Sequence, residues 1–134
     1  IFAKKKRSEI MRRIGAQNST QEKYAFKLVR SIGYKFHRHT ADLPGKPDIV
    51  FPGRKKVIFI NGCFWHAHNC DRASIPKTNR TFWLRKIRSN IARDKRNHQK
   101  LNKIGWSYCV LWQCQLKRSE EVKLIDRIQH FLGR

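Results

Sequence analysis

A short stretch in the middle of the chain, NGCFWHAHNC at residues 61–70, brings cysteine and histidine close together. Thiolate and imidazole are the ligands of a tetrahedral structural Zn²⁺ site. Cys63, His68 and Cys70 supply a local set, so a fourth ligand has to come from a distant segment. Cys114 ends an apolar run and is a better candidate than Cys109, which lies inside that run. Inert, buried thiols are the alternative to a metal site.

The same stretch places Phe64 beside Trp65, and Trp83 follows at the start of a long helical pattern. Two adjacent aromatic side chains do not both face one core in most backbone conformations. Proteins that bend DNA insert apolar side chains between base steps, so these aromatics are candidates for intercalation. Packing in the protein core is an equally good interpretation of the same residues.

The chain holds only nine acidic residues, so each can be weighed as a catalytic group or a metal ligand. Asp48 begins a β-rich run, where its carboxylate can point into a cleft or bond its own backbone in a turn. Asp94 falls on the apolar stripe of the long helical pattern, where an unpaired charge is costly. It is either an active-site carboxylate or a buried partner of a cation or of His98. Glu22 is explained by a capping box that begins at Ser19.

The elements that position these residues follow from the hydrophobic periodicity. A basic helix over 4–14 precedes a second helix that begins with STQE (19–22) and ends at Gly33. The remaining pattern predicts strands over 34–39, 48–51 and 56–60, a helix over 81–105, a strand over 106–114 and a helix over 120–132. The inward stripes are Ala25, Leu28, Val29 and Ile32 in one helix, Leu84, Ile87, Ile91, Asp94, His98 and Leu101 in the next, and Val122, Ile125, Ile128 and Leu132 in the last. This order predicts an α/β (α+β) fold with a mixed sheet flanked by helices.

The composition favours a nucleic-acid partner. In 134 residues, 31 Lys and Arg face nine Asp and Glu, which gives a net charge of +22. Such an excess repels itself unless an anion compensates it, and phosphate is the usual one. An acidic membrane surface is a poorer fit, and there is no transmembrane-length apolar run. We expect one domain over 1–134 with a basic arm over 1–18, in the reducing cytoplasm.

Four ordered segments of the chain carry a resemblance to a known family: LPGKPDIVF (43–51), VIFINGCFWHAHNC (57–70), TNRTFWLRKIRSNIARDKR (78–96) and GW…VLWQC (105–114). Together they resemble the very short patch repair (Vsr) endonucleases. The resemblance implies a restriction-endonuclease-like fold with a structural zinc site. It also implies Mg²⁺-dependent nicking of double-stranded DNA on the 5′ side of the thymine in a T:G mismatch.

The resemblance further implies roles for individual residues. Asp48 corresponds to the main Mg²⁺ ligand, and Ile60 corresponds to the residue that lends a backbone carbonyl to the metal. His66 matches the catalytic histidine near the attacked phosphate, Asp94 matches a supporting acid, and Glu22 matches an acid that faces the active site. The structural zinc corresponds to Cys63, His68, Cys70 and Cys114, and the wedge beside the mismatch to Phe64, Trp65 and Trp83.

One residue departs from the family pattern. Asn61 stands where the family carries a second histidine, and asparagine can hydrogen-bond a phosphate but cannot carry a proton as imidazole does. A sequence- or structure-specific nickase without mismatch preference, and a non-catalytic zinc-containing nucleic-acid-binding module, are therefore alternatives. For the endonuclease, we expect a monomer at the bacterial nucleoid, with no membrane contact and with mismatch-repair proteins as candidate partners.

Overall fold

The computed structural model of the protein describes residues 20–63 and 77–133. The predicted helix over 4–14 lies outside these ranges. The described elements are the helical segment 20–31, β1 (His37–Arg38), β2 (Ile49–Phe51), β3 (Lys56–Asn61), α2 (Arg80–Lys103), β4 (Ser107–Trp112) and α3 (Glu121–Leu132). Short 3₁₀ turns lie at Pro52–Arg54, Gln113–Gln115 and Arg118–Glu120.

The strands form one mixed sheet in the order β1-β2-β3-β4. β1 pairs with β2 and β2 with β3 in antiparallel fashion, whereas β3 and β4 run parallel. Parallel neighbours need a long crossover, and α2 supplies it between β3 and β4. The predicted mixed α/β architecture is therefore confirmed.

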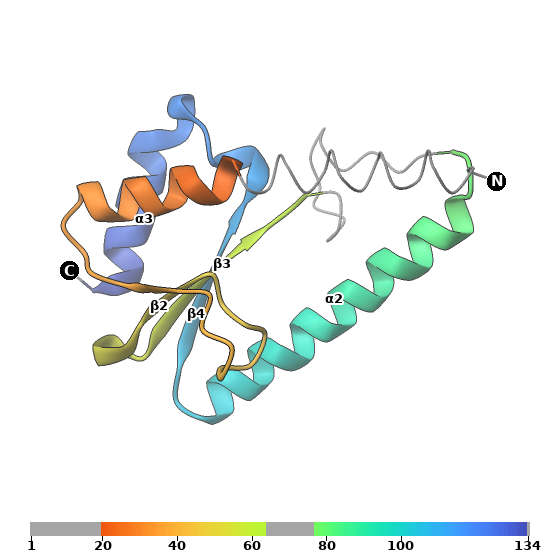
Figure 1. Ribbon diagram of the computed structural model, residues 1–134, viewed down its shortest axis with the longest axis horizontal. Helices are drawn as coiled ribbons and strands as arrows, with labels where there is room; N and C mark the ends of the chain where they lie inside the picture. Colours follow the sequence, from red (N-terminus) through yellow and green to blue (C-terminus); the bar gives the residue numbers. More distant parts are fainter. Residues whose placement is uncertain (1–19, 64–76, 134) are drawn as a thin grey trace.

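Helices cover both faces of this sheet. Ile49, Ile58 and Leu111 point to one side, where they form a core with the helical segment 20–31 and α3. Val50, Val57 and Phe59 point to the other side and pack with Leu101 of α2. Figure 1 shows the segment 20–31 and α3 together on one side of the sheet, and α2 running away from the opposite side. Successive residues of β2 and β3 point to opposite faces of the sheet, and both sets are apolar because each face packs against helices.

The predicted inward stripe of segment 20–31 is confirmed, since Ala25, Leu28 and Val29 are buried. The predicted stripe of α3 is confirmed at Ile128 and Leu132, and Ile125 is partly buried against the same core, but the prediction is wrong at Val122. Val122 is 82% exposed, and the buried residues of α3 are Leu124, Ile128 and Leu132. These side chains lie one turn apart and form the row that packs on the sheet.

The predicted stripe of α2 is confirmed at Ile87 and Leu101, which are buried, but it is interrupted at Ile91, which is 43% exposed. Burial along α2 is therefore confined to separate points, and Asp94 lies half-buried between them. Within the described residues, no helix combines the length and the apolar character that crossing a membrane needs.

The first strand is much shorter than the predicted range 34–39. Only His37 and Arg38 pair with β2, because His39 adopts a left-handed backbone conformation with φ of 52°. Histidine is one of the residues that tolerates this region better than most. The His39 N–H still donates to the Asp48 carbonyl oxygen at 3.2 Å, so the two segments stay together where the ladder ends.

Candidate active site and metal ligands

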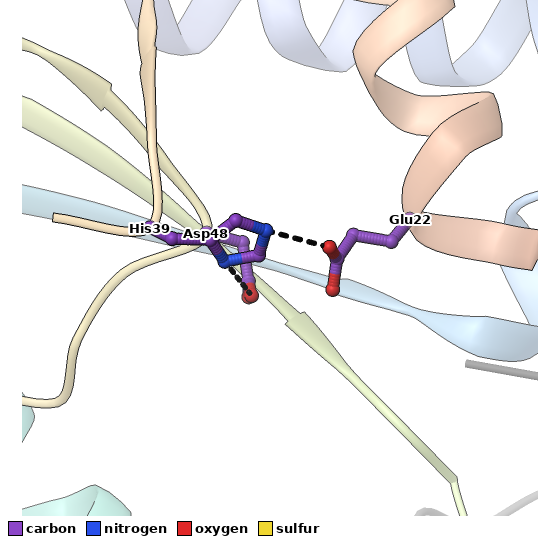
Figure 2. A group of neighbouring side chains, drawn as sticks. All are labelled: Glu22, His39 and Asp48. Carbon is purple, nitrogen blue, oxygen red and sulfur yellow. Dashed lines mark ion pairs between the residues drawn. The ribbon is translucent and has the colours of Figure 1, made fainter. Parts of the chain in front are cut away.

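Three side chains from separate segments meet at the edge of the sheet where β1 ends. Glu22 comes from the helical segment 20–31, His39 follows β1, and Asp48 precedes β2. His39 Nε2 lies 2.8 Å from Glu22 Oε1, and His39 Nδ1 lies 3.8 Å from Asp48 Oδ1 (Figure 2). One oxygen or nitrogen atom from each residue lies within 4.8 Å of the other two. This is an arrangement that can hold a divalent cation.

The pairing of β2 with β3 fixes the Asp48 carboxylate. The register places Ile49 opposite Ile58, and the Ile60 N–H donates to Asp48 Oδ2 at 2.7 Å. This long-range bond holds Oδ2 against β3 and leaves Oδ1 on the side of His39. Asp48 and Ile60, which the resemblance implies as the two protein ligands of Mg²⁺, are therefore neighbours in space.

The surroundings of Asp48 disfavour its negative charge. Its side chain is 20% exposed, and burial raises the pKa of Asp48 from 3.8 to about 6. The Ile60 N–H opposes this rise in pKa, the Glu22 carboxylate adds to it, and His39 opposes it weakly. A carboxyl group whose ionised form is disfavoured is typical of an active site, where a bound cation restores the charged form.

A pocket of about 560 Å³ opens beside this carboxylate. Asp48, just before β2, and Asn61 at the end of β3 line it on one side, and Asp94 lines it from α2. The same pocket carries two cationic side chains, Lys46 and Arg93, which suit a phosphate group. The structure therefore brings three of the predicted catalytic residues, 48, 61 and 94, to one pocket, although they come from different elements.

The three described cysteines lie in two different environments. The Cys114 N–H donates to the Sγ of Cys63 at 3.4 Å, so two predicted zinc ligands from distant segments are neighbours. Cys109 lies instead in the core that packs against α3, where burial raises the pKa of its thiol. A thiol in that environment resists becoming the thiolate that zinc needs.

The other predicted site residues divide into two groups. Trp83 is fully buried and packs edge-on against Phe82, with ring centroids 4.9 Å apart, so its position gives no support to a contact with DNA. The rest lie outside the described residues: Phe64, Trp65, His66, His68 and Cys70. Ser19, the predicted capping residue of the second predicted helix, also lies outside, whereas the carboxylate of its supposed partner Glu22 contacts His39.

Sequence reasoning missed His39 altogether. The segment 34–39 looks like an ordinary strand, and nothing in its spacing links His39 to Glu22 or Asp48. Only the left-handed conformation at residue 39, which the residue types do not announce, turns this side chain toward the two carboxylates.

Comparison with known proteins identifies the family of this chain. The family model for DNA mismatch endonuclease Vsr matches residues 1–72. The type II nicking enzyme V.XorIIP of Xanthomonas oryzae pv. oryzae is 45% identical over 111 residues, which cover 83% of this chain and 82% of that protein. The DNA mismatch endonuclease Vsr of Escherichia coli is 36% identical over an alignment of 135 residues, covering 98% of this chain and 86% of that protein. The chain therefore belongs to the Vsr family of DNA mismatch endonucleases and is a DNA endonuclease.

Proposed function

We propose that this endonuclease nicks double-stranded DNA on the 5′ side of the thymine in a T:G mismatch, in a reaction that depends on Mg²⁺. The observation that carries the proposal is the Asp48 carboxylate, held by the Ile60 N–H beside Glu22 in the pocket that Asp94 also lines. A pure DNA-binding module gains nothing from acids in a phosphate-binding pocket, whereas a hydrolase needs them to hold its cation.

The residues present fit a hard cation such as Mg²⁺, which prefers oxygen ligands. Asp48 Oδ1 and the carbonyl oxygen of Ile60 are the protein ligands we assign. The ion, when bound, neutralises the charge that builds on the scissile phosphate during an in-line displacement. Lys46 and Arg93, which line the pocket, hold the neighbouring phosphates of the substrate strand.

Proton transfer falls to a histidine in this proposal. His66 takes the proton from the attacking water, because an imidazole exchanges protons near neutral pH. Asn61, which is buried and lines the same pocket, orients the water or a phosphate oxygen through its amide. Asp94 fixes the orientation of its neighbours in the pocket from α2.

The structural zinc and the wedge complete the proposal. We assign Zn²⁺ to Cys63, His68, Cys70 and Cys114, and the contact between Cys63 and Cys114 supports one pair of that set. A structural zinc contributes on the order of 10 kcal/mol to folding, enough to make a short loop rigid. Phe64 and Trp65, which follow Cys63 in the sequence, are the side chains that we assign to the wedge beside the mismatch.

A nicking assay tests the proposal. A labelled duplex with one T:G mismatch and its fully paired twin are incubated with the protein and Mg²⁺. We expect a nick 5′ of the mismatched thymine and none in the paired duplex. Asp48→Asn abolishes the nick, while Asp126→Asn, an exposed acid of α3, leaves it unchanged. Equal nicking of both duplexes refutes the mismatch specificity.

A second candidate function is nicking without mismatch preference. Two similar proteins are named type II nicking enzymes: V.XorIIP and V.NmeAIP of Neisseria meningitidis, the latter 41% identical over 117 residues, which cover 87% of this chain and 84% of that protein. Asn61, where the resemblance implies a histidine, is a second reason to test this function, because an amide cannot carry a proton as imidazole does. The paired duplex in the same assay distinguishes the two functions.

A further inference from the structure

We infer that His39 is a metal ligand of this active site, whose Nδ1 binds a divalent cation together with Asp48 Oδ1 while Glu22 holds the ring in place. The inference rests on the proposed function and adds a nitrogen ligand to the oxygen ligands assigned above. Glu22 thereby acts as a positioning residue for His39.

The hydrogen-bond geometry selects the tautomer. His39 Nε2 lies 2.8 Å from Glu22 Oε1, so the Nε2–H donates to that carboxylate. The lone pair of Nδ1 then faces Asp48 Oδ1, 3.8 Å away, while Asp48 Oδ2 accepts from the Ile60 N–H. A histidine that binds a metal usually donates its other N–H to a carboxylate in this way, which fixes the tautomer and raises the basicity of the ligand atom.

The separation of the two ligand atoms suits a metal ion. Two donors that each lie about 2.1 Å from one ion are themselves roughly 3–4 Å apart, depending on the angle at the metal. The 3.8 Å between His39 Nδ1 and Asp48 Oδ1 falls inside that interval. By contrast, a direct hydrogen bond between them would bring them to about 2.9 Å.

The fold holds the imidazole in this position. The left-handed backbone at His39, with φ of 52°, ends β1 and turns the side chain toward Glu22 and Asp48. The ring of Phe26 meets the imidazole edge-on, with centroids 5.8 Å apart and planes at 88°, and Arg38 lies over the same phenyl ring. The His39 side chain is still 54% exposed, so a cation and its water can reach Nδ1 from solvent.

The ligand type predicts which cation the site prefers. Mg²⁺ is bound almost entirely through oxygen, whereas first-row transition metals bind imidazole more tightly than Mg²⁺ does, Mn²⁺ least and Co²⁺ and Zn²⁺ more strongly. An imidazole beside Asp48 therefore increases the affinity for Mn²⁺ more than the affinity for Mg²⁺. His39 thus makes the site more tolerant of transition metals than the oxygen ligands alone.

Pulsed electron paramagnetic resonance with Mn²⁺ tests the assignment directly, because it detects ¹⁴N nuclei bonded to the ion. We expect the full chain to bind Mn²⁺ with ¹⁴N coupling, and Asp48→Asn to remove the binding. His39→Gln should remove the coupling and weaken Mn²⁺ binding by about 10–100-fold, with a much smaller loss for Mg²⁺ in competition. His37→Gln, which changes an exposed histidine of β1 two residues before His39, should alter neither.

The outcomes separate this inference from the proposed function. Coupling that persists in His39→Gln, no coupling in the unaltered chain, or no binding of Mn²⁺ that depends on Asp48 would each overturn the role of His39. The nicking assay on the two duplexes is read independently. A protein that shows the His39-dependent coupling but nicks the paired duplex supports the ligand and refutes the mismatch specificity.

Discussion

Replacing Asp48 by asparagine should stabilise the metal-free protein at high pH while abolishing its nuclease activity. The raised pKa of Asp48, about 6 against 3.8, means that the folded protein disfavours the ionised carboxylate. Asparagine keeps an oxygen that can accept from the Ile60 N–H and removes the charge. The change therefore relieves the cost of burying a carboxylate beside Glu22 without removing its main hydrogen bond.

The size and sign of the effect follow from proton linkage. One pKa unit corresponds to about 1.4 kcal/mol, so a rise of roughly two units costs the folded state about 2–3 kcal/mol once the carboxylate is ionised. The pKa of Asp48 is higher in the folded protein than in the unfolded chain. The contribution of its carboxyl group to the free energy of unfolding is therefore fully present below pH 3.8 and is lost as the pH rises through about 6. The variant should thus match the parent near pH 3.8 and exceed it by about 2–3 kcal/mol at pH 8.

Urea unfolding at both pH values, without added divalent cation, measures this difference. Other charged or titratable groups face this site or its pocket and can titrate in the same pH range, so the control has to be an acid outside it. These groups are Glu22, His39, Asp94, Lys46 and Arg93. Asp126→Asn on the exposed side of α3 should change the free energy of unfolding by no more than about 0.5 kcal/mol at either pH. An Asp48→Asn protein that folds normally but is no more stable than the parent at pH 8 would refute the reasoning.

Two further predictions concern the zinc site and the turn beside the pocket. Cys114→Ser should lose bound zinc, measured by elemental mass spectrometry, whereas Cys109→Ala should keep it, because Cys109 belongs to the core; equal zinc content in both variants would contradict the assignment. Gly45→Ala should cost about 2–3 kcal/mol of unfolding free energy, since φ is +83° and the new Cβ would lie 2.9 Å from the Phe59 ring. Gly53→Ala meets no atom within 4 Å and serves as the control in the same thermal melts.

The sequence predicts those elements best whose side chains face a core. β3 and the long helix α2 were placed within about two residues of their observed ends, because continuous apolar runs and glycine stops mark them. In the first turn of α3 the prediction chose Val122 in place of Leu124, since both side chains are apolar and only the contact with the sheet decides between them. Tertiary packing, rather than local propensity, selects the buried row in such a helix.

The candidate site was predictable to the extent that its residues conflict with the local pattern. Asp94 lies on an apolar stripe and Asp48 lies at the start of a buried strand, and a carboxylate in either place costs stability unless it has a functional role. Both residues line one pocket. Glu22 was less visible because a capping box explains it locally, and His39 was invisible because it breaks no pattern in the sequence. A polar residue at an apolar position can therefore be recognised from the sequence. A residue such as His39, which reaches the site only through its backbone conformation, cannot.

The topology explains why the missed residue lies where it does. β1 is an edge strand of the described sheet and pairs only with β2. A left-handed residue in a central strand would break ladder hydrogen bonds on two sides, whereas at this edge His39 leaves the ladder and still donates to the Asp48 carbonyl. The end of a short edge strand is therefore the place where this sheet can turn an imidazole toward Asp48 at the smallest cost in backbone pairing, while β3 holds that carboxylate from the other side.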